Sequence, residues 1–138
     1  MFPGIEALPL QLVLVLPTTG KAVRTARETA EQVVRQWGIS PSHPSVGPAL
    51  LIVSELVTNS VRHAAILCED LTVLFAASRD TFAFAVHDRH PHQPPLHAAA
   101  PGRGLATVTE LTLGLGGTAE IRADADGHGK TIWVTLPL

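Results

Sequence analysis

The chain has 138 residues, of which 46% are hydrophobic and 16% charged, and its formal net charge is −2. This length suits a single domain over residues 1–138, and the weakly acidic balance excludes the general basic surface of most nucleic-acid-binding proteins. Cys68 is the only cysteine, which excludes an intramolecular disulfide and a cysteine-rich metal site, so we expect it to be a small buried side chain.

The N-terminal part of the chain is predicted to form a strand followed by a helix. The apolar run at residues 8–16 is too short to cross a bilayer and has no basic residue before it, so we interpret it as a strand. We therefore expect a cytoplasmic protein without a membrane partner. Thr18 or Thr19 then caps a helix that ends at Trp37, because apolar residues recur within it at spacings of three or four. Gly38 is the expected stop.

The middle of the chain is predicted to form a second helix and a hairpin. A loop rich in proline and serine, residues 40–48, precedes a helix that runs to about residue 65. Pro48 can occupy the first turn of this helix, where its missing N–H is not needed. The runs 71–77 and 81–86 are rich in β-branched and aromatic residues and are separated by a short polar turn, which predicts a β-hairpin.

Beyond the hairpin, a loop precedes one short helix and two strands. Residues 90–101 hold four prolines and three histidines without a period, so they are predicted to form a loop that moves or covers another part of the protein. A helix is expected over residues 105–113. Strands are expected at 118–123 and 131–136, joined by the glycine-bearing turn at 124–129.

The second predicted helix carries the first candidate site. Glu55, Asn59 and His63 recur at four-residue steps and fall within about 80° of one another on its surface, flanked by Thr58 and Arg62. A carboxylate and a carboxamide one turn apart can share Mg²⁺ or hold a water against it. The alternative is a solvated polar face, and the pattern alone does not decide between them. Short polar side chains, rather than long lysine and glutamate, favour a site.

Two weaker features lie downstream. Asp88, at the end of a predicted strand, can accept hydrogen bonds from the exocyclic amine of an adenine, or can simply cap the following turn. Gly102 and Gly104 precede a helix, so the backbone can approach a phosphate and direct N–H groups at it. A short glycine pair is also typical of an ordinary loop, so neither feature is specific by itself.

Four histidines cluster around the proline-rich loop. Imidazoles spaced this closely can share Zn²⁺. However, the prolines stiffen the loop, and no cysteine or second carboxylate completes a metal site. Solvated histidines are the favoured interpretation. These residues are His87, His90, His92 and His97.

The order of these features resembles that of the GHKL, or Bergerat-fold, ATPases. The order is an acidic helix with an asparagine, a strand-end aspartate, a proline-rich loop, a Gly-x-Gly helix entry and a hairpin ending Gly129-Lys-Thr-Ile-Trp-Val134. Within that superfamily the chain is similar, over about residues 17–136, to the anti-sigma-factor serine kinases and related actinobacterial ATP-binding regulatory proteins. The resemblance implies an α+β two-layer sandwich with a mixed, mostly antiparallel sheet and helices on one face, the histidine-kinase-like ATPase fold.

The resemblance also implies roles for individual residues. Glu55 matches the general base or water-orienting acid, Asn59 the ligand of the Mg²⁺ that bridges the ATP phosphates, and Asp88 the acid that binds the adenine amine. The other implied nucleotide-binding residues are Gly102, Arg103, Gly104 and Leu105 beside the phosphates and Thr131 in the adenine pocket. On the first helix, Arg27 or Arg24 matches an arginine that contacts the protein partner.

The implied function is that of a Mg-ATP-dependent protein serine/threonine kinase and anti-sigma factor, which binds a sigma factor and phosphorylates an anti-anti-sigma antagonist. A homodimer is what the kinase relatives suggest. Two departures from the pattern keep an alternative open: residues 89–94 replace the glycines that usually follow the acid matched by Asp88, and the lid, about residues 92–101, is short. The alternative is an inactive or weakly active module that binds nucleotide or partner and regulates by sequestration. ATP hydrolysis without a protein acceptor is a third option.

Overall fold

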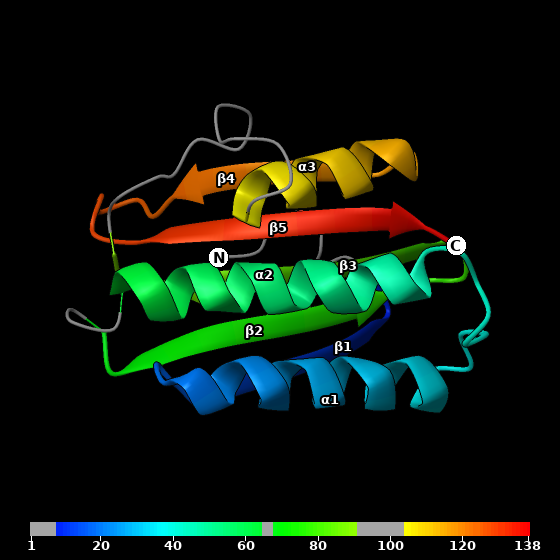
Figure 1. Ribbon diagram of the computed structural model, residues 1–138, viewed down its shortest axis with the longest axis horizontal. Coiled ribbons are helices and arrows are strands. Elements are labelled where there is room, and N and C mark those ends of the chain that lie inside the picture. The colour runs from blue at the N-terminus through cyan, green and yellow to red at the C-terminus, as the bar shows by residue number, and fades with distance from the viewer. Residues whose placement is uncertain (1–7, 65–67, 91–103) are drawn as a thin grey trace.

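The computed structural model describes residues 8–64, 68–90 and 104–138 (Figure 1). Within these ranges no helix is long and apolar enough to span a membrane. The elements, in chain order, are β1 (Leu10–Pro17), α1 (Gly20–Gln36), α2 (Val46–Ala64), β2 (Asp70–Ala77), β3 (Thr81–Asp88), α3 (Gly104–Gly114), β4 (Thr118–Ala123) and β5 (Lys130–Pro137).

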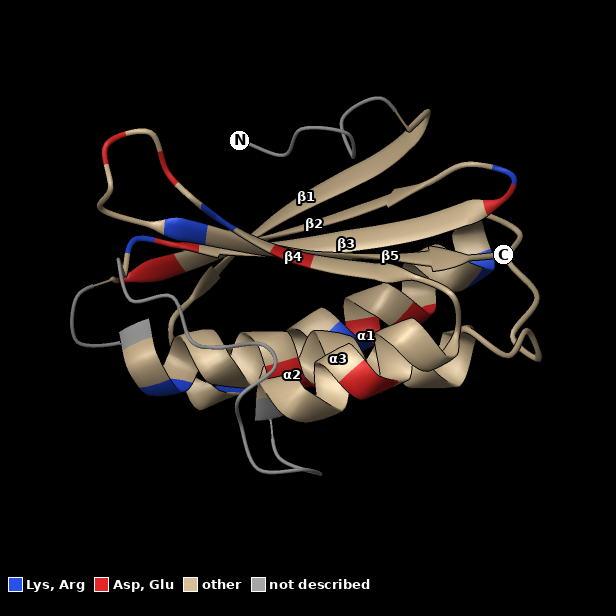
Figure 2. Ribbon diagram, turned by 90° about the horizontal axis from the view of Figure 1, so that it is seen from above, with Lys and Arg blue, Asp and Glu red and all other residues tan. Residues whose placement is uncertain are grey.

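The five strands form one sheet in the order β1-β2-β3-β5-β4. Each of its neighbouring pairs is antiparallel, so the sheet in the described part of the chain is simpler than the mixed one expected from the resemblance. The helices α1, α2 and α3 lie together on one face of this sheet (Figure 2). The predicted α+β two-layer architecture is therefore confirmed.

The main core lies between the sheet and the helices. Alternate side chains of β3, Phe82, Phe84 and Val86, are almost completely buried there, because residues two apart on a strand face the same side. The small residues of α1 let the helix lie close to the sheet: Ala26 and Ala30 have no exposed surface. The alternation of side chains along β3 therefore determines which of its residues face the helices.

The other face of the sheet carries a second, smaller apolar cluster. It contains Ala83 and Ala85 of β3 and Trp133 of β5. The guanidinium of Arg122 on β4 lies 4.7 Å from the centre of the Trp133 ring, a cation–π contact. Odd-numbered residues of β3 and β5 therefore face away from the helices, whereas even-numbered ones face them.

The predicted limits of the first helix are confirmed. Thr19 is its N-cap residue, although its side chain makes no capping hydrogen bond. At the other end Gly38 has φ +72°, a left-handed conformation that favours glycine. The N–H of Gly38 donates to the Arg35 carbonyl and that of Ile39 to the Val34 carbonyl, the Schellman arrangement.

Of the strand limits that differ from the prediction, two affect the site. β3 continues two residues further, so Asp88 is its last residue rather than a loop residue, and β5 begins one residue earlier, at Lys130. Asp88 and Lys130 are direct cross-strand partners in the sheet register. The predicted burial of Cys68 is confirmed.

Candidate functional site

The carboxylate of Asp88 is the centre of the candidate site. Its oxygens accept hydrogen bonds from three donors: the side chains of Ser60 on α2 and Lys130 on β5, and the backbone N–H of His90. Lys130 Nζ lies 2.8 Å from Oδ1 and 3.1 Å from Oδ2, Ser60 Oγ lies 2.6 Å from Oδ2, and the His90 nitrogen lies 2.9 Å from Oδ1. These bonds join one helix and two strands at the C-terminal end of β3, on the face of the sheet that the helices cover.

Both charges of this ion pair are out of the solvent. Asp88 is 2% exposed and Lys130 is 1% exposed. A charge this deeply buried costs several kcal/mol unless a partner of opposite charge compensates for it, so each residue depends on the other. Gly129 allows β5 to begin this close to β3, because a methyl group at that position would stand 2.7 Å from the Asp88 carbonyl oxygen.

The polar residues of α2 differ in their exposure. Glu55 and Asn59 are half-buried, whereas His63 is exposed. The Nδ2 atom of Asn59 is buried and finds no hydrogen-bond partner among the described residues. Buried amides normally have a partner, so this atom is one to which a ligand could bind. The sequence pattern alone allowed this face to be fully exposed to solvent. The half-burial of Glu55 and Asn59 differs from that alternative.

The helix α3 contacts α2, and its start lies beside the middle of that helix (Figure 1). Gly104 is the first residue of α3, and Leu105 after it is buried in the main core, which anchors this end of the helix. The first turn has no acidic side chain. The N–H groups of a helix's first turn have no acceptor within the helix, so together with the positive end of the helix dipole they suit an anion such as a phosphate. Gly102 and Arg103 lie outside the described residues.

Thr131 does not meet Asp88 in the structure. It is buried, but the strand alternation places it on the side of Trp133, away from the helices. Its neighbour Lys130 is the β5 residue that reaches the carboxylate. Sequence reasoning missed both Lys130 and Ser60. The signal at Lys130 was a lysine at the start of an otherwise apolar strand; Ser60 had no signal beyond following Asn59.

A second polar network lies on the opposite face of the sheet. His87 Nε2 is 2.8 Å from Asp124 Oδ2, and Arg89 donates to Asp124 at 2.7 Å and to Asp126 at 2.8 Å. The carboxylate of Asp126 accepts hydrogen bonds from Arg89 and from the N–H of His128, and these bonds lower the pKa of Asp126 to about 2. The network ties the β4–β5 turn to the end of β3.

The histidines do not form a metal site within the described residues. No group of three or more histidine, cysteine or acidic side chains there is arranged to hold an ion. His87 is instead engaged with the carboxylate of Asp124. Of the four histidines considered from the sequence, His92 and His97 lie outside the described residues.

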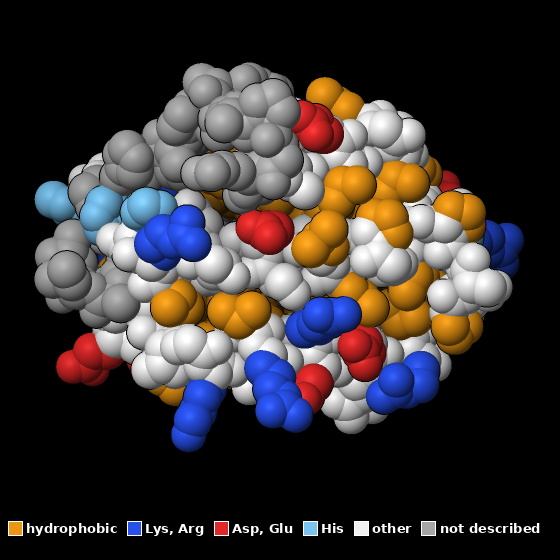
Figure 3. Space-filling view, in the orientation of Figure 1, with side chains coloured by type: hydrophobic (Ala, Val, Ile, Leu, Met, Phe, Trp, Pro, Cys, Tyr) orange, Lys and Arg blue, Asp and Glu red, His pale blue; other side chains and the backbone are white. Residues whose placement is uncertain are grey.

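The predicted partner-binding residues lie on the solvent side of α1. Arg24 and Arg27 are exposed and pair one turn along the helix with Glu28 at 3.0 Å and Glu31 at 3.8 Å. Figure 3 shows positive and negative side chains interleaved along the edge of the molecule where Figure 1 places α1. Exposed pairs of this kind add little stability, so the arginines remain available to another protein.

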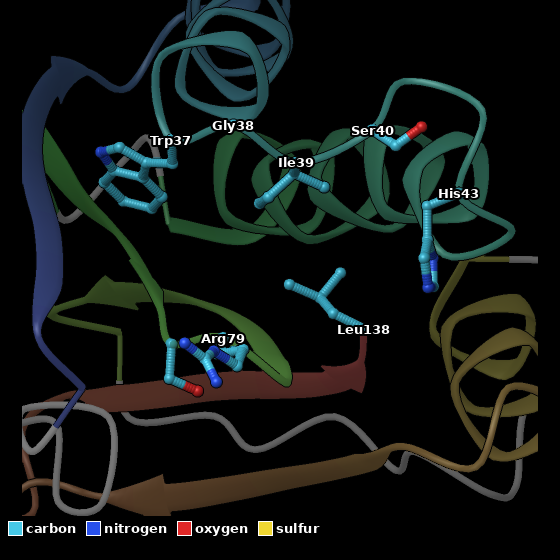
Figure 4. A pocket seen from close by; sticks show the side chains of 8 residues that line it. Trp37, Gly38, Ile39, Ser40, His43, Arg79 and Leu138 are labelled. Atoms are coloured by element: carbon cyan, nitrogen blue, oxygen red, sulfur yellow. The ribbon is translucent and has the colours of Figure 1, made fainter.

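A pocket of about 430 Å³ lies at the other end of β3, far from Asp88 (Figure 4). The side chains of Ile39 and Leu138 point into it, whereas that of Ser40 points away. It contains none of the site residues predicted from the sequence, so we do not assign the candidate function to it. Its lining residues are Trp37, Gly38, Ile39, Ser40, His43, Ser78, Arg79 and Leu138.

The sequence matches the family of histidine kinase-like ATPase domains over residues 16–136. A comparison with curated proteins finds no match. The family match covers the described elements from the end of β1 to β5, together with every residue discussed for the candidate site.

Solved structures with this fold include kinases. The RsbU and RsbW domains of a Mycobacterium tuberculosis protein match with a TM-score of 0.69 and 22% identity, over 94% of this chain and 33% of that one. The histidine kinase domain of the Erythrobacter litoralis EL346 blue-light activated histidine kinase matches with a TM-score of 0.55 and 18% identity, over 89% and 62%. Full-length ShkA in complex with AMPPNP gives 0.52 and 22%, over 89% and 31%. This chain therefore spans about a third of the first of these structures, and the likeness to all three is one of fold.

Proposed function

Because the chain belongs to the histidine kinase-like ATPase domain family, which implies ATP binding, we propose that it is a Mg-ATP-dependent regulatory protein. Its proposed activity is that of a cytoplasmic serine/threonine protein kinase and anti-sigma factor. It would bind a sigma factor and phosphorylate an anti-anti-sigma antagonist. The observation that carries the proposal is the buried Nδ2 atom of Asn59, which has no hydrogen-bond partner among the described residues and lies on α2, the helix that contacts α3.

The residues around Asn59 suit a nucleotide with its metal. A carboxamide can turn to present either its oxygen to Mg²⁺ or its NH₂ group to a phosphate oxygen, so the side chain of Asn59, whose Nδ2 has no partner among the described residues, fits both groups. The first N–H groups of α3, from Gly104 onward, would hold phosphate oxygens, with Gly102 and Arg103 proposed from the family resemblance alone. When bound there, Mg²⁺ would supply positive charge to neutralise the phosphates. Asp88 lies at the proposed base end of the site.

Glu55 is the proposed catalytic residue. It lies one helical turn before Asn59 on α2 and is half-buried, so its carboxylate shares the face that carries the proposed metal ligand. A carboxylate there can accept the proton of an incoming serine hydroxyl while Asn59 holds the metal. The catalytic contribution of the fold is then mainly the positioning of these groups.

Mg-ATP is expected to raise the melting temperature of the wild-type protein, and Asn59→Ala is expected to abolish the increase. At a ligand concentration 100-fold above Kd, binding stabilises the native state by about 2.7 kcal/mol. The measurement is thermal unfolding with and without millimolar Mg-ATP. Gln36→Ala, at an exposed position of α1, is the matched control and should keep the full increase.

The same experiment can contradict the proposal. If wild-type protein shows no increase with Mg-ATP, nucleotide binding fails, and the alternative of a module that regulates by sequestration is left. If Asn59→Ala keeps the increase, the protein binds nucleotide but Asn59 is not its ligand.

Glu55→Gln is expected to lower phosphoryl transfer to the antagonist by at least about 10²-fold, because the amide cannot take the hydroxyl proton. Its Mg-ATP-dependent increase in melting temperature should remain. The measurement is transfer of radiolabel from ATP to candidate antagonist proteins. Glu110→Gln, an exposed position on α3, is the control and should transfer normally. Transfer at the wild-type rate in Glu55→Gln would remove the proposed role, and label released only as free phosphate would indicate hydrolysis without an acceptor.

The exposed arginines of α1 are the proposed contact with the protein partner. Arg24 and Arg27 both lie at the solvent side of the helix layer, where they pair with the exposed side chains of Glu28 and Glu31. Such pairs can be exchanged for carboxylates of a partner at little cost. A homodimer stays a prediction from the resemblance.

A further inference from the structure

The carboxylate of Asp88 has no acceptor site left for a base. A carboxylate offers about four lone-pair sites on its two oxygens. Oδ1 accepts from Lys130 Nζ and the His90 N–H, and Oδ2 accepts from Ser60 Oγ and again from Lys130 Nζ. These four bonds, with donor–acceptor distances between 2.6 and 3.1 Å, use the whole capacity of the group.

Lys130 is as fully engaged as Asp88. Its ammonium has three N–H donors, and they are directed at the two oxygens of Asp88 and, at 3.4 Å, at the carbonyl of His90. The side chain is 1% exposed, so bulk solvent does not compete for these contacts. The lysine and the aspartate therefore satisfy each other within the protein.

We propose that Lys130 removes selectivity for adenine, because its ammonium takes the acceptor sites on Asp88 that the 6-amino group of adenine would need. This inference rests on the proposed nucleotide function of the site. A purine would then enter without a hydrogen bond from its 6-amino group to Asp88. The protein would bind purine nucleoside triphosphates through their phosphates and ring surface, with little selection for the substituent at position 6.

The competing explanation is that Lys130 only stabilises the fold and gives way when ATP binds. The two explanations differ in the ratio of affinities for two nucleotides. A hydrogen bond to a buried carboxylate is worth about 1.5–3 kcal/mol, or roughly 10- to 150-fold in affinity. A nucleotide without the 6-amino group loses that factor only if Asp88 accepts the amine.

The deciding experiment compares ATP with purine riboside 5′-triphosphate, which carries hydrogen in place of the 6-amino group. Dissociation constants for wild-type protein are measured by calorimetry with Mg²⁺ present. We expect the two constants to agree within about threefold, because ATP gains no hydrogen bond to Asp88 that the analogue lacks. If ATP binds 10-fold or more tightly than the analogue, the inference is overturned while the proposed function stands.

Lys130→Thr tests the cause. Removing the ammonium frees acceptor sites on Asp88, so ATP should gain at least about 10-fold over the analogue in the variant. Lys21→Thr, at an exposed position of α1, is the control and should keep the wild-type ratio. A folded Lys130→Thr protein with an unchanged ratio overturns the inference. If this variant does not fold, the wild-type ratio alone decides.

Failure of the proposed function has a different signature. If neither nucleotide binds to wild-type protein, nor to a folded Lys130→Thr protein, the nucleotide site is absent and both proposals fall together. If ATP binds only once Lys130 is removed, the lysine excludes the nucleotide altogether, which overturns both the proposed function of the wild-type protein and the inference that it binds purine nucleotides without selecting the substituent at position 6.

Discussion

Lys130→Met is expected to lower the free energy of unfolding by about 3–5 kcal/mol, because it leaves the buried Asp88 carboxylate without its cation. In the wild-type protein the ammonium lies 2.8 Å from that carboxylate and neither group reaches solvent. Methionine fills a similar volume, so the loss reports the unpaired charge rather than a cavity. The measurement is urea denaturation at neutral pH.

A double-mutant cycle separates the pair from its surroundings. Lys130→Met combined with Asp88→Asn removes both charges, and the carboxamide oxygen introduced by the second substitution can still accept from Ser60. The double variant should cost less than the sum of the two single variants by about 1–3 kcal/mol, since contacting residues do not act additively. Lys21→Met, at an exposed position, is the control and should change stability by less than about 0.5 kcal/mol. Additive losses in the cycle would contradict the direct ion pair.

Gly117→Ala is expected to lower the free energy of unfolding by about 3 kcal/mol, because the new methyl group would overlap backbone. The ideal position of that methyl carbon overlaps the Thr135 carbonyl oxygen of β5 and stands 3.0 Å from Leu136 Cδ2. A backbone carbonyl held in the sheet cannot move aside as a flexible side chain can. Thermal or urea unfolding measures the loss.

Gly114 provides the matched control for this substitution. It ends α3, its φ is not positive, and nothing lies within 4 Å of the position a methyl group would take. Gly114→Ala should therefore leave stability unchanged or raise it slightly, by up to about 1 kcal/mol. Equal losses at Gly114 and Gly117 would show that the effect is not the predicted overlap with β5.

The elements of the fold could be predicted from the sequence because their signals are local. The 3.6-residue period of α1, the glycine at position 38 and the hairpin pattern around residue 80 depend only on residues near each other in the chain. The strand ends depend on pairing as well as on local pattern. β5 starts at Lys130, a charged residue that a search for apolar runs leaves out.

The candidate site was predicted in part for the same reason. Glu55 and Asn59 share a helical face that the sequence displays directly, and Asp88 follows an apolar strand. Thr131 lies on the opposite side of the sheet from the Asp88 carboxylate, because one residue along a strand reverses the face, and the pattern alone does not give the strand register. Lys130, the neighbour of Thr131, is the β5 residue that contacts the Asp88 carboxylate.

The sequence by itself therefore determined the kinds and order of the elements, the family resemblance and the polar helix face, all of which follow from short-range periodicity and residue type. Only the tertiary structure decided that Asp88 is paired, and with what. Its partners Ser60 and Lys130 stand 28 and 42 residues away in the chain and meet it through helix packing and β3–β5 register. Contacts of that range arise from how the elements pack, and no local pattern encodes them.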